Sequence, residues 1–201
     1  MKRINRRSRM VLFTVLMAVM LAAVYSSGIL ISEDMVTGSF LNAKLPPCPA
    51  HPFGTDALGR DLFFRTLKGL SVSITVGLAA SAVSAVIAVL AGAAAAIGSK
   101  RVDAVISWLI DLVMGIPHTI LIILISFALG RGLKGLIAGI AATHWCSLAR
   151  LVRGEVLQLR SERYVAISRK LGKSGGFILM HHMLPHLAPQ FLVGLILMFP
   201  H

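Results

Sequence analysis

The 201-residue sequence has few charged residues, and acidic residues above all are scarce. Only 14% of the residues are charged, with eight Asp or Glu against twenty Lys or Arg, whereas 56% are apolar. An ordinary soluble domain has about 25% charged residues, so this composition excludes that class. The net charge of +12 does not indicate nucleic-acid binding, because the basic residues lie between long uncharged runs and are not interleaved with aromatics.

Cysteines and nucleotide-binding motifs are also scarce. Cys48 and Cys146 are far apart in the chain and belong to no metal-type cluster, so they indicate neither a disulfide framework nor a metal site. No complete Walker motif occurs, and Gly54 and Gly59 do not have the spacing of a phosphate-binding loop. No nucleophile is accompanied by a positioned base. We therefore expect no enzyme activity, no catalytic residue and no cofactor.

Long runs without Asp, Glu, Lys or Arg predict an all-α, polytopic membrane bundle of about five spans, because a helix needs about 20 apolar residues to cross the hydrocarbon. The runs are 10–32, 69–99, 112–130, 135–149 and 187–200. The first run, with its basic front, could instead be a cleaved signal peptide. Its length favours an uncleaved span.

The distribution of Lys and Arg predicts the orientation of these spans. If the N-terminus is cytoplasmic, fourteen of the twenty basic residues lie inside and six lie outside. This arrangement places 1–9 in the cytoplasm and 33–68 outside. Within the remaining region, 69–201, it makes 150–185 a cytoplasmic loop.

Three features of the spans predict how they pack. Small residues recur at four-residue intervals in the second run, which lets neighbouring helices approach closely and favours packing over pore lining. Pro117, near the start of the third run, should bend or break its helix. Asp103 and Asp111 are expected to be interfacial carboxylates near Lys100 and Arg101. The small residues form two rows, Gly77, Ser81 and Ala85, and Ser84, Ala88, Gly92 and Ala96.

The basic loop 150–185 predicts a compact projection. Residues 150–171 contain helix formers and no proline, and Gly172 should end that helix with a positive φ. A turn, a second short helix over 177–183 and Pro185 would then return the chain to the membrane. The apolar side chains of this loop lie among cations and would suit a partner's groove, and a loop lying on anionic lipid is an equal alternative. These apolar residues are Val165, Ile167 and Leu171.

The segment from Tyr164 to Pro185 resembles the EAA loop of ABC importer permeases. That loop reads Glu-Ala-Ala, three residues, Gly, nine residues, Ile, one residue, Leu-Pro. With Gly172 aligned on its glycine, Leu184 and Pro185 fall on Leu-Pro, and His182 replaces Ile. The Glu-Ala-Ala positions are occupied by Ala166, Ile167 and Ser168, so the acidic residue is missing.

A second resemblance lies at residues 51–69, "HPFGTDALGRDLFFRTLKG". It is similar to "HPLGTDxLGRDxxSRxxxG", which follows the first span on the outer face of dipeptide, oligopeptide and nickel permeases. Two further stretches, "RVDAVISWLIDLVMGIPHTILII" and "HWCSLARLVRGEVLQLRSERYVAISRKLG", resemble the start of the subfamily's third span and the approach to its coupling helix. The resemblance covers roughly residues 1–201. Because the family usually continues through a sixth span, we expect a C-terminally truncated product.

The resemblance implies half of a translocation pore for dipeptides, oligopeptides or nickel, free or as a chelate. Its partners would be a homologous second permease, two ATPase subunits and an extracytoplasmic solute-binding protein, in the lipid bilayer of a bacterial or archaeal cytoplasmic membrane. A secondary transporter and a non-transporting fragment are the alternatives from other classes. The histidines do not obviously converge, so no metal site is predicted.

Two sets of site residues follow from this resemblance. In the outer motif, Gly54 and Gly59 would supply turns, while Asp56, Arg60 and Asp61 cap turns and pair with one another. A role of this motif in docking the binding protein is the second possibility. The ATPase-coupling set is Val165, Ala166, Ile167, Ser168, Leu171, Gly172, Leu184 and Pro185.

Overall fold

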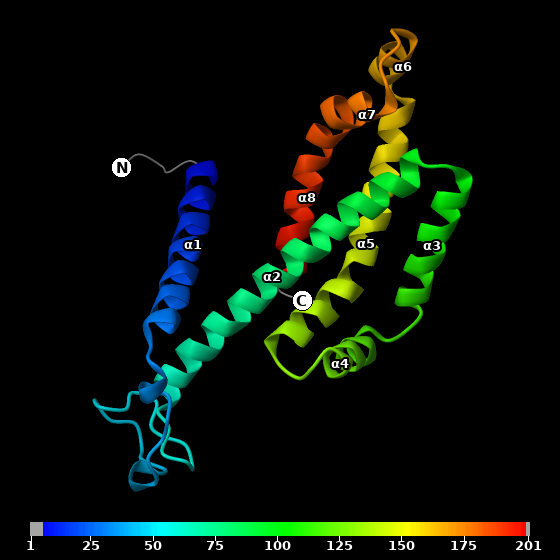
Figure 1. The fold of residues 1–201 in the computed structure, drawn as a ribbon. Helices are drawn as coiled ribbons and strands as arrows, with labels where there is room; N and C mark the ends of the chain where they lie inside the picture. Colours follow the sequence, from blue (N-terminus) through cyan, green and yellow to red (C-terminus); the bar gives the residue numbers. More distant parts are fainter. Residues whose placement is uncertain (1–5, 200–201) are drawn as a thin grey trace. The chain divides into compact units, whose positions relative to one another are not determined.

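The computed structural model describes residues 6–199, which form helices joined by loops, the longest of them over residues 31–61 between the first two helices (Figure 1). The chain divides into two compact units, Met1–Thr75 and Val76–His201, and each is described by itself. The helices are α1 (Arg6–Leu30), α2 (Leu62–Ile97), α3 (Lys100–Met114), α4 (His118–Ala128), α5 (Leu133–Ser161), α6 (Arg163–Lys170), α7 (Gly175–Ile178) and α8 (Leu184–Met198). Short 3-10 turns lie at Glu33–Met35 and Phe40–Asn42, and Leu179–Met183 is π-helical.

Among the described residues, three helices are long and apolar enough to cross a membrane: α1, α2 and α5. The pair α3 and α4 makes a fourth if it is counted as one broken span. The helical membrane bundle expected from the sequence is thus confirmed. The helix that holds most of the expected fifth run, α8, has 15 residues and is not among the helices long enough to cross a membrane. The last position of that run, Pro200, lies outside the described residues, as do Lys2 and Arg3 of the N-terminal segment.

The third expected span is broken where Pro117 predicts a bend. The N–H of Gly115 still donates to the Asp111 carbonyl at 2.9 Å, after which the backbone leaves the helix. Pro117 has φ −52° and ψ 119° and stands immediately before α4. Proline has no N–H to donate and disfavours a helical residue before it, so the first helix ends there. The axes of α3 and α4 differ by 95°, a turn that is plain in Figure 1.

Small residues in the second half of α2 bring it close to α5. A Cβ added to Gly92 would lie 2.5 Å from the Ala149 carbonyl oxygen, so only glycine fits this approach. The Ser84 hydroxyl donates to the Ala141 carbonyl at 3.3 Å. These contacts are what small residues permit between helices in a bilayer, and they match the packing expected of the row that contains Ser84 and Gly92.

The basic region 150–185 differs from expectation at its start. A single helix was expected over 150–171, but α5 continues to Ser161 and a separate helix, α6, begins at Arg163. Glu162 between them is extended, with φ −67° and ψ 143°. The Ser161 hydroxyl donates to the Gln158 carbonyl at 2.6 Å, and such side-chain bonds compete with the helical ladder. Residues 150–161 are therefore the last part of α5.

The two carboxylates of α3 also have different partners from those expected. Asp103 accepts two hydrogen bonds from the Arg153 guanidinium, both at 2.6 Å, and Asp111 pairs with Arg150. The expectation that they lie near Lys100 and Arg101 as simple interfacial charges overlooked α5. Because α3 and α5 run beside each other, arginines 39 and 50 residues away come within reach.

Candidate functional site

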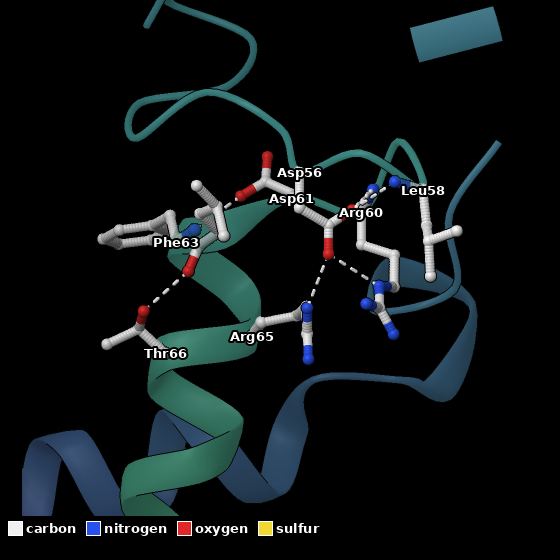
Figure 2. Close-up of polar contacts among 8 residues, drawn as sticks. Asp56, Leu58, Arg60, Asp61, Phe63, Arg65 and Thr66 are labelled. Atoms are coloured by element: carbon white, nitrogen blue, oxygen red, sulfur yellow. Dashed lines mark hydrogen bonds and ion pairs between the residues drawn. The ribbon is translucent and has the colours of Figure 1, made fainter. Parts of the chain in front are cut away.

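The first candidate site is the loop His51–Asp61 in the first unit, organised around Asp56. Oδ1 of Asp56 accepts the backbone N–H groups of Leu58 at 2.9 Å and Arg60 at 3.0 Å. Its Oδ2 accepts the Nε–H of Arg60 at 2.8 Å and an Nη1–H of Arg65 at 2.6 Å (Figure 2). Asp56 therefore caps a turn and pairs with Arg60, as its position in the sequence suggested.

These donors determine the acidity of Asp56. The N–H of Arg60 contributes most, the limited burial of the carboxyl opposes it, and the N–H of Leu58 and the Arg60 guanidinium add to the lowering. Together they lower the pKa of Asp56 from 3.8 to about 2. The carboxylate is thus ionised over the whole physiological range and holds its donors permanently.

Asp61 acts as a cap, as expected, but its side-chain partner differs from the expected one. Its partner is neither Asp56 nor Arg60. Its Oδ2 lies 2.8 Å from Nδ1 of His51, and its Oδ1 accepts the N–H groups of Phe63 at 2.8 Å and Phe64 at 3.3 Å. The latter bonds make Asp61 the N-cap of α2. Burial of the carboxyl raises its pKa, but the bonds from His51, Phe64 and Phe63 outweigh this, and the pKa of Asp61 is lowered overall.

Gly54 and Gly59 occupy left-handed turn positions, with φ of +73° and +72°. Each also lies against backbone. A Cβ added to Gly54 would be 2.6 Å from the Leu45 carbonyl oxygen, and one added to Gly59 would be 1.8 Å from that of Ser39. Both positions therefore require glycine for conformation and for space.

Sequence reasoning missed Thr55, which is buried in this loop. Its hydroxyl accepts the N–H of Leu45 at 2.8 Å and donates to the carbonyl of Asn42. It thereby joins the loop to residues at least ten positions earlier. A contact over this distance cannot be predicted from a local sequence pattern. The capping role of Asp61 was foreseeable, because an Asp directly before an apolar helix is an N-cap signal. The side chains of Thr55, Asp56 and Asp61 are thus hydrogen-bonded within the loop or to residues beside it. Among the described residues of the loop, none is a nucleophile with a base.

The second candidate site, in the second unit, is α6 with the turn that follows it. Gly172 has φ +76°. Its N–H donates to the Arg169 carbonyl at 3.0 Å, and the N–H of Lys173 donates to that of Ser168 at 3.1 Å. This pair of bonds is a Schellman motif, which closes a helix end. The expected glycine turn is present, and an added Cβ would meet no atom within 4 Å among the described residues.

The burial of the residues in the ATPase-coupling set shows that one of them, Val165, was wrongly expected to be exposed. Val165 is fully buried and belongs to the core with Ile178, Met183 and Leu187, so it is not an exposed knob for a partner. Ile167 and Leu171 are exposed, at 57% and 73%. The remaining members that are exposed or partly exposed are Ala166, Ser168, Gly172, Leu184 and Pro185.

Tyr164 presents an unusual feature of the same element. Its ring lies edge-on to His182 and His186, with centroids 5.8 Å and 6.0 Å away. Among residues 6–199 with described side chains, its hydroxyl is the buried side-chain group that has no hydrogen-bond partner. His182, which replaces the family's Ile, has its Nε2 3.2 Å from the Ser168 hydroxyl. The histidine substitution therefore links α6 to the π-helical turn.

The tripeptide Gly172-Lys173-Ser174 shares the end of a phosphate-binding loop but not its context. Ile167 stands where that motif needs its first glycine, and only the four-residue α7 follows. It is therefore not a nucleotide site. The described residues also contain no cluster of three or more His, Cys, Asp or Glu suited to a metal. Two histidines do come together, because the rings of His118 and His144 lie 6.0 Å apart.

Three features characterise the chain: a broken span, a loop centred on an aspartate, and a helix after α5 that a glycine ends. The family described as binding-protein-dependent transport system inner membrane component matches residues 84–201. The chain belongs to this family. The permease is 36% identical to the oligopeptide transport system permease protein OppC of Bacillus subtilis (strain 168), and the match covers 83% of this chain.

Two further relatives agree with this assignment. The dipeptide transport system permease protein DppC of Bacillus subtilis is 34% identical over 84% of this permease. A Brucella suis (biovar 1, strain 1330) permease provisionally named for peptide transport is 35% identical over 97% of it. The chain spans about half the length of the two Bacillus relatives, 55% of OppC and 52% of DppC.

Proposed function

We propose that this permease forms half of the membrane pore of an ATP-driven importer of short peptides. The observation that carries the proposal is the match of residues 84–201 to the permease family together with relatives named for oligopeptides and dipeptides. Nickel is the other cargo that the resemblance implied. Neither the relatives above nor the histidine positions support it.

The partners would be a homologous second permease, two ATPase subunits and an outer solute-binding protein. A permease of this kind does not hydrolyse ATP itself, so energy must arrive through a contact with an ATPase. The exposed end of α6 suits this contact. Ile167 and Leu171 offer apolar area, and Arg169 and Lys170 are positive charges beside it that would steer an acidic surface into place.

The orientation proposed from the basic residues puts α6 in the cytoplasm and His51–Asp61 outside. Cysteine labelling tests it directly, because Cys48 is exposed and Cys146 is buried. An impermeant maleimide added outside intact cells should modify Cys48 and spare a cysteine introduced at Ser174. The reverse pattern would refute the orientation.

Co-purification tests the assembly. An ATPase encoded beside this permease should copurify with it, and Ile167→Glu or Leu171→Glu should abolish the association while leaving membrane insertion unchanged. Val165→Ala is the matched contrast, because it removes buried volume and should destabilise α6 itself by about 1 kcal/mol or more. Gly172→Val should also weaken association and stop uptake, by misdirecting the chain after α6.

Uptake distinguishes the alternatives. If ATP-dependent accumulation of a labelled tripeptide requires this permease and the ATPase, a secondary transporter and an inert fragment are both excluded. Uptake that continues after removal of the ATPase would favour a secondary transporter. Failure of the permease to associate with any ATPase or second permease would favour the fragment.

A further inference from the structure

A cavity of about 770 Å³ lies in the second unit beside the break between α3 and α4. Its wall is formed by the end of α3, the break at 115–117, the first residue of α4, and parts of α5 and α8. Small-molecule sites commonly measure about 300–1,000 Å³. Irregular backbone inside a membrane occurs only within protein or beside a water-filled cavity, so the break and the cavity belong together.

Two imidazoles line this cavity. His118 begins α4 and His144 lies on α5, with their rings edge to face and 6.0 Å apart. Nδ1 of His144 lies 2.9 Å from the Thr143 hydroxyl and 3.1 Å from the Ile140 carbonyl, which holds the ring in place. His118 is exposed, and its imidazole makes no hydrogen bond with the described side chains or backbone, so its nitrogens are available to a ligand.

The wall carries no acidic side chain that would oppose an anion. Its described lining residues include no Asp, Glu, Lys or Arg, so the two imidazoles are its candidate donors to a carboxylate. Pro117 supplies no side-chain cap to α4. The partial positive charge at the start of that helix adds to the attraction.

The remainder of the wall suits a peptide and not merely an anion. The carbonyl oxygens of Gly115 and Ile116 accept no backbone hydrogen bond within residues 6–199, and both residues line the cavity. A peptide supplies N–H groups for such acceptors. The other lining side chains are largely apolar and could receive aliphatic side chains. They include Val113, Leu148, Leu151, Val193 and Leu197.

We propose that this cavity binds the C-terminal end of a short peptide, with its carboxylate between His118 and His144 and its N–H groups directed at the carbonyls of Gly115 and Ile116. The choice of a peptide rests on the proposed function. The preference for a carboxylate rests on the cavity wall alone. A fatty acid would share the carboxylate and the apolar body but would have no N–H to donate.

Binding to the full chain in lipid nanodiscs tests the site without requiring transport. With isotope-labelled histidine, the NMR signals of His118 and His144 should shift saturably on addition of tri-alanine. Tri-alanine amide should bind about tenfold more weakly or worse, because a hydrogen bond to a charged group is worth more than one to a neutral group. Octanoate should bind more weakly than tri-alanine.

Two variants and a control complete the test. His118→Gln and His144→Gln should each weaken tri-alanine binding about tenfold or more by the same argument. His186→Gln, outside the cavity, should leave binding unchanged. Equal binding of acid and amide, tighter binding of octanoate, or full binding by both cavity variants would overturn the proposal.

Uptake by the assembled transporter tests the binding site and the proposed function independently. If the wild-type assembly imports tri-alanine and both cavity variants import it equally well, the site is refuted and the function stands. If no assembly imports any peptide while the chain binds tri-alanine as described, the importer function fails and the carboxylate site stands.

Discussion

His51 and Asp61 are joined by a contact of 2.8 Å between Nδ1 and Oδ2, while the other oxygen of Asp61 caps α2. A single carboxylate thus fastens the start of a long helix to a bend ten residues earlier. Asp61→Ala should cost about 0.5–2 kcal/mol for the lost cap alone. Asp61→Asn keeps a capping oxygen and should cost less. Hydrogen exchange at Cys48, whose N–H donates to the His51 carbonyl, reports the loosening. Equal protection in all three proteins would contradict the role of Asp61.

The lowered pKa of Asp56 predicts a loss of stability in acid. Its folded pKa of about 2 is below the ordinary 3.8, so protons bind more tightly to the unfolded loop and ionisation favours folding. The contribution is fully present above pH 3.8 and is lost as the pH falls through about 2. Pepsin digestion between pH 4 and 2 should cleave this loop faster as the pH falls. In Asp56→Asn, digested at the same pH values, the cleavage rate should change only as the activity of pepsin itself changes. Identical pH profiles for the two proteins would contradict the assignment.

Replacement of three glycines by alanine should change the stability of the protein by different amounts. Gly59→Ala meets both a positive φ and the Ser39 carbonyl, so it should cost well above the roughly 1–2 kcal/mol of a left-handed residue. Gly172→Ala meets the positive φ but open space, so it should cost about 1–2 kcal/mol. Gly154, inside α5 and also in open space, is the control: Gly154→Ala should stabilise by about 0.5–1 kcal/mol. Thermal unfolding in detergent would check the order, and a Gly172 variant as damaging as the Gly59 variant would contradict it.

Removal of the Tyr164 hydroxyl should stabilise the protein. A buried polar group without a partner costs about 1–3 kcal/mol, so Tyr164→Phe should recover part of that amount and raise the unfolding temperature. Tyr164→Ala, which also removes the ring packed against His182 and His186, should lower it. A destabilised Phe variant would indicate that the hydroxyl has a partner in the membrane or in the assembled transporter.

Local chemistry explains which features the sequence could predict. A proline within an apolar run and a glycine after a helix act through their own backbones, so the break at Pro117 and the positive φ of Gly172 were foreseeable. The burial of Val165 was not, because it depends on Ile178 and Leu187 folding back over α6. The same holds for the partners of Asp103 and Asp111, which lie on a helix dozens of residues away.

The two ion pairs between α3 and α5 also constrain motion. Asp103 and Asp111 are eight residues apart on one helix, and their partners Arg153 and Arg150 follow in the reverse order on the other. Two such anchors between antiparallel helices resist sliding, because a shift of one helical turn, about 5.4 Å, would separate both pairs at once. Displacement of α5 by a force on α6 would therefore carry α3 with it, and with α3 the bend at Pro117 and the cavity beside it.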